Sequence, residues 1–182
     1  VQEAPVFGNG RWVALNFSTD EYATPAVLTA PDLSLGFTLQ PMLLDCNCKV
    51  LSAPAWSVSL NSFIVLLDRE IATSSDGVNW KVLASLKYTP MPYPINNVID
   101  GIGPRPVFVD PVWLYFTNSS GKISQVLVNL KNPRNPSTVD LPLTVDFNAI
   151  EWLRWSNVWM RQVYYARGGI IQTSTDAYTW YN

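Results

Sequence analysis

The sequence predicts an all-β fold, namely a small β-propeller of about four four-stranded blades, with a β-sandwich as the alternative. Three observations support this prediction. An aromatic-led apolar run recurs about every 50 residues, a polar turn and a second β-prone run follow each copy, and no segment keeps the 3.6-residue apolar period of an amphipathic helix. Four short antiparallel strands in a repeat of this length are typical of a propeller blade, which buries its faces against neighbouring blades.

The aromatic runs mark the second strand of each unit. They contain Trp12, Phe63, Trp113 and Trp159, which are 51, 50 and 46 residues apart. Because an aromatic residue in a strand is usually part of a core, we expect these four side chains to pack between blades.

The remaining strands are placed around the aromatic runs. A short run precedes each of them, starting at Ala4, Ala55, Arg105 and Ala149, and a β-prone run follows each turn, starting at Ala26, Ile71, Ile123 and Ile170. A fourth run is clearest from Trp80, in WKVLASL. The chain is therefore expected to form one domain, 1–182, with approximate units 1–45, 50–88, 104–140 and 145–182.

The composition argues against several classes of function. Of the 182 residues 48% are hydrophobic and only 14% are charged, and the net charge is −2 with no cluster of Lys and Arg. Nucleic-acid binding needs such a cluster, and a membrane span needs roughly 18–20 consecutive apolar residues, so we expect neither partner. The low charge suggests that partners cover part of the surface, and the alternative is a polar surface of Ser, Thr and Asn.

Cys46 and Cys48 are the two cysteines, and the chain has no histidine. Neighbouring side chains of a strand point to opposite faces, so we expect these two residues to be poorly placed to bridge each other. Free thiols are the expected state, with intermolecular bridging as the alternative. A four-ligand zinc site would need carboxylates to complete it, so we expect no metal and no cofactor.

A short motif occurs twice. Ser74, Asp76, Gly77 and Trp80 form the pattern Ser-x-Asp-Gly-x-x-Trp in TSSDGVNW, and Ser174, Asp176 and Trp180 repeat it in TSTDAYTW. The stretch from Ala30 to Phe37 is a degraded third copy, with Asp32 in the key place. Each of the two clear copies follows the third predicted strand of its unit.

This motif resembles the Asp-box of sialidase-type β-propellers, which lies between the third and fourth strands of a blade. Together with FGNGRWVAL it also resembles the Asp-box repeats of bacteriophage virion proteins. The resemblance implies a structural turn. Its Asp would accept hydrogen bonds from backbone N–H groups, its Gly would adopt a positive φ, and its Trp would pack in a seam between sheets. We therefore expect Asp76 and Asp176 to be structural rather than catalytic.

Catalysis has little support in the sequence. Sialidases bind the carboxylate of their substrate with three arginines, and no arginine of this chain lies in a sequence context that matches one of them. The absence of histidine excludes Ser-His-Asp chemistry within one chain. Paired carboxylates need a cleft that holds them roughly 5–10 Å apart, and nothing in the sequence positions such a pair. The sequence therefore predicts that the chain is not an enzyme.

The expected function is a non-catalytic structural module of a bacteriophage virion, either a capsid decoration protein or a tail-associated protein, bound to other virion proteins or to like subunits. The alternative is a lectin-like module that binds a cell-surface glycan, in a secreted or extracellular setting. Its candidate ligand-binding residues are Trp152, Arg154 and Trp155. If one strand ran through this segment, Trp155 and Trp159 would face one way and residues 152 and 154 the other.

Overall fold

The computed structural model describes residues 4–16, 26–44, 46, 48–90, 106–119, 122–140, 146–155, 158–165, 168–175, 179 and 181; for residues 122, 123, 140 and 146–171 it describes the backbone alone. In this part of the chain every regular element is a strand, except for a single 3₁₀ turn, η1 (Leu33–Leu35). The prediction of an all-β chain is confirmed. No helix in the described residues is long and apolar enough to cross a membrane.

The strands form four sheets in which consecutive strands pair antiparallel in chain order, except for one short parallel strand at an edge of the second sheet, described below. The first sheet contains β1 (Val6–Gly8), β2 (Arg11–Asn16), β3 (Ala26–Ala30) and β4 (Thr38–Pro41). The second contains β6 (Ala55–Ser57), β7 (Ser62–Leu66), β8 (Glu70–Ser74) and β9 (Asn79–Ser85). The third contains β10 (Val107–Val109), β11 (Val112–Ser119), β12 (Lys122–Asn129) and β13 (Ser137–Asp140). The fourth contains β14 (Asp146–Trp155), β15 (Val158–Tyr165) and β16 (Gly168–Ser174).

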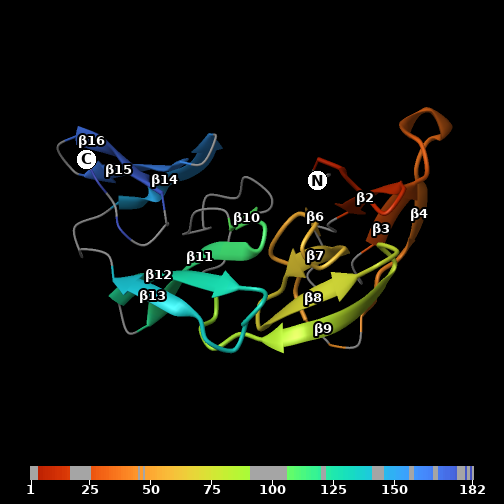
Figure 1. Ribbon diagram of the computed structural model, residues 1–182, viewed down its shortest axis with the longest axis horizontal. Coiled ribbons are helices and arrows are strands. Elements are labelled where there is room, and N and C mark those ends of the chain that lie inside the picture. The colour runs from red at the N-terminus through yellow and green to blue at the C-terminus, as the bar shows by residue number, and fades with distance from the viewer. Residues whose placement is uncertain are drawn as a thin grey trace.

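Figure 1 shows these sheets following one another in an arc, from β1–β4 at one end to β14–β16 at the other.

The connection between β1 and β2 illustrates how the sequence determines a hairpin. Gly8 pairs with Arg11, so Asn9 and Gly10 alone connect β1 to β2, with φ of 45° and 73°. An Asn-Gly pair tolerates positive φ at both positions and matches the twist of the flanking strands.

Strand β7 of the second sheet is buried on both faces, because its apolar run supplies side chains to two cores in alternation. Phe63 and Val65 pack with Val13 and Leu15 of the first sheet. Ile64 and Leu66 point the other way and pack with residues of the third sheet, including Trp113 and Tyr115. Phe63 and Trp113 are therefore packed between sheets, as predicted.

Trp12 departs from that prediction. It pairs with Ala30 on the face of the first sheet opposite to Val13 and Leu15, and no described sheet covers it. The aromatic residues of the second and third sheets face the preceding sheet, and the first sheet has no described predecessor. The side chain of Trp159, the fourth aromatic of the series, lies outside the described residues.

A further strand, β5 (Leu43–Leu44), was not expected from the sequence. It follows the first sheet but pairs in parallel with β9 at the edge of the second, with Leu43 opposite Asn79 and Leu44 opposite Trp80. The Leu43 N–H donates to the Val78 carbonyl at 3.1 Å. The chain therefore joins the second sheet before it begins that sheet's own four strands.

Candidate functional site

The turn between β8 and β9 contains the first Asp-box motif and is closed by its own side chains. Asp76 Oδ1 accepts hydrogen bonds from the backbone N–H groups of Val78 and Asn79 at 2.9 and 2.8 Å. The Ser74 hydroxyl donates to the same oxygen at 2.9 Å and accepts from the Gly77 N–H at 2.8 Å. Asn79 Nδ2 donates to Asp76 Oδ2 at 2.7 Å. Both carboxylate oxygens are thus held within the turn.

These contacts set the charge state of Asp76. Burial alone would raise the pKa of this carboxyl group, but the hydrogen bonds from Asn79, Val78 and Ser74 outweigh it and hold the pKa well below its ordinary value. Asp76 is therefore ionised at neutral pH, and both of its carboxylate oxygens accept hydrogen bonds from groups of the turn. A carboxylate in this arrangement is poorly suited to move a proton at pH 7.

The same turn is attached to the first sheet. Asn9 Nδ2 donates to the Ser75 carbonyl at 2.9 Å, and an Arg11 guanidinium N–H donates to the Asp76 carbonyl at 3.2 Å. Gly77, with φ of 76°, lies against Val13, so a Cβ atom at this position would overlap that side chain. The turn therefore connects two neighbouring sheets as well as two strands.

Other copies of the motif differ in how much of them is described. Asp176 and Trp180 lie outside the described residues. Ser174 is buried, and Thr173 pairs with Tyr181 in the same register in which Thr73 pairs with Lys81. In the degraded copy Asp32 caps η1 and accepts a hydrogen bond from the Ser34 N–H at 2.8 Å.

An aromatic pair recurs in the first three sheets at equivalent cross-strand positions. The ring centroids are 4.8 Å apart for Trp56 and Phe63, and 5.1 Å apart for Phe108 and Trp113. In the first sheet the pair is Phe7 and Trp12, at 5.2 Å. On the second strands Phe63 and Trp113 are buried, whereas Trp12 is half-buried. On the first strands Trp56 and Phe108 are half-buried, whereas Phe7 is 51% exposed.

A shallow hollow of about 370 Å³ lies beside the pair of exposed Phe7 and half-buried Trp12, and is lined by Phe7, Trp12, Pro31, Asp32 and Leu33. Its volume lies near the lower end of the range of small-molecule sites. The hydrogen bonds from Ser34 hold the pKa of Asp32 below its ordinary value, so the hollow combines aromatic faces with an ionised carboxylate. Sequence reasoning named both Trp12 and Asp32, but as packing and turn residues, and it did not bring them together.

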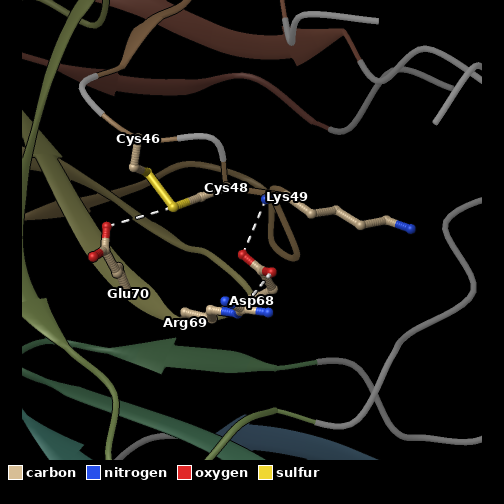
Figure 2. Close-up of a disulfide and its surroundings, with 6 residues drawn as sticks. All are labelled: Cys46, Cys48, Lys49, Asp68, Arg69 and Glu70. Carbon is tan, nitrogen blue, oxygen red and sulfur yellow. Dashed lines mark hydrogen bonds and ion pairs between the residues drawn. A yellow bond between two sulfur atoms is a disulfide. The ribbon is translucent and has the colours of Figure 1, made fainter. Parts of the chain in front are cut away.

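The two cysteines form a disulfide, with 5.3 Å between their Cα atoms, which corrects the expectation of free thiols. The argument from alternating faces applies within a strand, and these residues follow β5, where its pairing has ended. Figure 2 shows the Glu70 side chain directed at this bridge. Among the described residues, Cys46, Cys48 and Glu70 are the group whose atoms lie close enough together to hold a metal ion.

The candidate glycan-binding residues of the fourth sheet are placed by their backbone register. Arg154 pairs with Trp159, and Trp155 pairs with Val158 at the end of the β14–β15 hairpin. Trp152, Arg154 and Trp159 thus occupy one face of the sheet and Trp155 the other. The single strand on which the shared face of Trp155 and Trp159 was conditional is not formed, because β14 ends at Trp155 and β15 begins at Val158. A ligand-binding role for these residues stays a prediction.

No protein-family model matches the sequence, and no curated protein matches it. Three solved structures are similar to the chain. A GH43 β-1,3-galactosidase with galactodeoxynojirimycin matches 97% of this chain and 73% of its own, at 10% identity and a TM-score of 0.52. An α-L-arabinofuranosidase of the same family from Clostridium thermocellum matches 97% of this chain and 69% of its own, at 13% identity and a TM-score of 0.50. A second GH43 β-1,3-galactosidase matches 98% of this chain and 44% of its own, at 12% identity and a TM-score of 0.52.

These likenesses establish a propeller-type β-repeat fold, because GH43 glycoside hydrolases are five-bladed β-propellers. The predicted count of four blades is not confirmed by them. Identities of 10–13% show the fold alone.

The comparisons also correct two functional expectations. The similar structures are glycoside hydrolases. This finding contradicts the prediction of a bacteriophage structural module and the prediction that the chain is not an enzyme. The physical reason lies in the motif that suggested the virion. An Asp-box closes a turn within a blade, and such a turn serves propellers of unrelated function equally well.

Proposed function

We propose that this chain is a carbohydrate-active β-propeller that binds a glycan through the exposed aromatic pair of its first sheet. The observation that carries the proposal is the combination of Phe7, Trp12 and Asp32 around one hollow, in a fold similar to enzymes that act on galactosides and arabinofuranosides. The aromatic pairs of the second and third sheets are used for packing, whereas the first pair is open to a ligand.

The chemistry of the hollow suits a sugar. A pyranose or furanose ring has a face of C–H groups and a rim of hydroxyl groups. The Phe7 and Trp12 rings offer an apolar platform for the C–H face, and the Asp32 carboxylate accepts hydrogen bonds from hydroxyl groups. One Asp32 oxygen holds the Ser34 N–H, which fixes the carboxylate at the rim.

The test is a titration of the purified chain with β-1,3-linked galactobiose and with an arabinofuranose oligosaccharide, followed by calorimetry. We expect saturable binding that is lost in Phe7→Ala and in Asp32→Asn and is retained in Tyr181→Ala. Tyr181 is a matched control because it is an aromatic residue that is 63% exposed, pairs with Thr173 of β16 and does not line the hollow. Binding that survives both Phe7→Ala and Asp32→Asn would refute the assignment of this hollow.

Trp152, Arg154 and Trp155 are a second proposed location for the same ligand class. Their tryptophans offer the same kind of platform, and Trp155 lies at the end of a hairpin, where binding residues often occur. The titration of Trp155→Ala separates the locations. Loss of sugar binding in Trp155→Ala, with Phe7→Ala unaffected, would move the site to the fourth sheet.

Glycoside hydrolysis is the second candidate function, favoured by the three similar structures. Hydrolysis by paired carboxylates requires two acids, and Asp32 is the single carboxylate among the residues that line the hollow. A catalytic centre would therefore use residues outside this hollow. Release of nitrophenol from aryl β-galactosides or aryl α-L-arabinofuranosides that survives Asp32→Asn is the result that would support it.

A further inference from the structure

The Cys46–Cys48 bridge and Glu70 form a compact group at the start of β8, an inner strand of the second sheet. The two sulfur atoms and a Glu70 carboxylate oxygen all lie within 4.8 Å of one another, and the three residues are half-buried. Glu70 is the first residue of β8, which fixes its backbone in a sheet, and Cys46 and Cys48 both pack against the core between the first two sheets.

The spacing of these atoms matches a tetrahedral metal site. Cys48 Sγ lies 3.5 Å from Glu70 Oε2. With metal–sulfur and metal–oxygen distances of about 2.3 and 2.1 Å, a tetrahedral ion separates a sulfur and an oxygen ligand by about 3.6 Å. The 5.3 Å between the Cα atoms of Cys46 and Cys48 lets two separated sulfur atoms approach one ion from the same stretch of chain.

The surrounding charges leave Glu70 available. The nearby carboxylate, Asp68, accepts a hydrogen bond from the Lys49 N–H at 3.0 Å and lies 3.9 Å from the Arg69 guanidinium (Figure 2). In the part of the chain that the structure describes, no Lys or Arg forms an ion pair with Glu70. A half-buried carboxylate beside two sulfur atoms and without a cation gains from a divalent ion.

We propose that reduction of the Cys46–Cys48 disulfide creates a binding site for a zinc-like divalent cation, held by two thiolates and the Glu70 carboxylate with a fourth position open to water. A dithiol reductant supplies two electrons and two protons, giving two thiols and becoming a disulfide itself. Metal binding then releases both thiol protons to solvent. While the bridge is intact each sulfur is bonded to the other, so the oxidised chain lacks the thiolate ligands.

The sulfur ligands determine which ions fit. Thiolates favour zinc and other borderline or soft ions, whereas magnesium and calcium prefer sites made of oxygen atoms alone. The site would also connect the segment that follows β5 directly to β8. Metal binding should therefore raise the thermal stability of the reduced chain, and it depends on neither the glycan site nor any hydrolytic activity.

The test uses Co²⁺ as a spectroscopic substitute for Zn²⁺, added to the full chain after reduction by a dithiol and its removal under inert gas. We expect one equivalent of Co²⁺ to bind, with thiolate charge-transfer absorption and the visible bands of a tetrahedral ion. Added Zn²⁺ should displace it. The oxidised chain should show none of these bands.

The variants separate the ligands from the neighbouring charges. Glu70→Gln keeps the side-chain volume and should weaken Zn²⁺ binding by at least tenfold. Cys48→Ser leaves one thiolate and should lower the charge-transfer absorption by at least half, whereas Asp68→Asn should leave the affinity unchanged. Three outcomes would overturn the proposal: no Co²⁺ binding by the reduced chain, equal binding by the oxidised chain, or unchanged affinity in Glu70→Gln. If Cys48→Ser fails to fold, the oxidised chain and Glu70→Gln still decide the question.

Discussion

The first and second sheets are built from the same sequence pattern, yet they differ in what covers them. Both carry an aromatic pair across their first two strands and an aspartate in the turn before their fourth strand. In the second sheet the pair is packed against the first sheet and the turn is attached to it. In the first sheet the pair borders a hollow, and Asp32 caps a single exposed 3₁₀ turn.

This difference shows that equivalent positions of the repeat can differ in burial. Phe7 and Trp56 occupy equivalent positions, and their burial depends on whether another sheet precedes them. The aromatic pair is thus part of the core in the second sheet and forms the proposed platform for a ligand in the first. Substitutions in the aromatic pairs of the two sheets should therefore have unequal effects, the larger one at the buried residue of the second sheet.

The largest effect is expected for Phe63→Ala. Phe63 is fully buried between two sheets, and the loss of such a side chain leaves a cavity, so the free energy of unfolding should fall by about 3–5 kcal/mol. Phe7→Ala removes a half-exposed ring and should cost about 0.5 kcal/mol. Denaturant unfolding of both variants checks the comparison, and similar losses would mean that the first sheet is covered in solution.

The next effect concerns two glycines with the same φ angle. Gly77 and Gly36 both have φ of 76°, but a Cβ atom at Gly77 would overlap Val13, whereas Gly36 has no atom within 4 Å. Gly77→Ala should therefore cost about 3 kcal/mol, from the positive φ and the overlap together. Gly36→Ala should cost about 2 kcal/mol, from the backbone conformation alone, because φ of 76° with ψ of 170° is a region that glycine occupies almost exclusively. Thermal melts of the two variants measure the contribution of the contact between the sheets.

The two aspartates should differ less. Asp76→Asn weakens several hydrogen bonds to one carboxylate and should lower the free energy of unfolding by about 1–2 kcal/mol, since solvent screens part of the interaction. Asp32→Asn should leave the melting temperature unchanged, because Asn caps a helical turn as well as Asp does. A large loss in Asp32→Asn would show that its turn is a structural clasp like that of Asp76.

The smallest effect is in the pH dependence. The pKa of Asp76 is lowered in the folded chain, so its contribution to stability is complete above the unfolded value of about 3.9 and is lost as the pH falls through the folded value. The stability difference between the wild-type chain and Asp76→Asn should thus shrink from pH 7 to about pH 2. Denaturant melts across this range test it, and a constant difference would contradict the charge as its source.

The sequence predicted the parts of the fold that repeat. Alternating burial along a strand and a side-chain-closed turn are local, so the run from Ser62 to Leu66 and the turn at Asp76 could be predicted from their own residues. The common register of Thr73 and Thr173 with residues eight positions later extends this regularity to the last sheet.

Features that depend on distant parts of the chain were missed. The parallel pairing of Leu43 with β9 and the approach of Glu70 to the cysteines join segments whose proximity no local pattern encodes. The hollow was missed for a related reason. Trp12 has the same position in its repeat as the buried Phe63 and Trp113, and it borders a hollow because no described sheet packs on its face.

The parallel strand β5 has a consequence for protein engineering. A repeat excised at residue 50 would lose Leu43 and Leu44, and with them the edge partners of Asn79 and Trp80. A portable copy of this repeat, moved into another propeller or duplicated within this one, should therefore begin at Leu43 and end at Ser85. Its first strand therefore lies within the predicted unit 1–45, although the last strand of the first sheet already ends at Pro41.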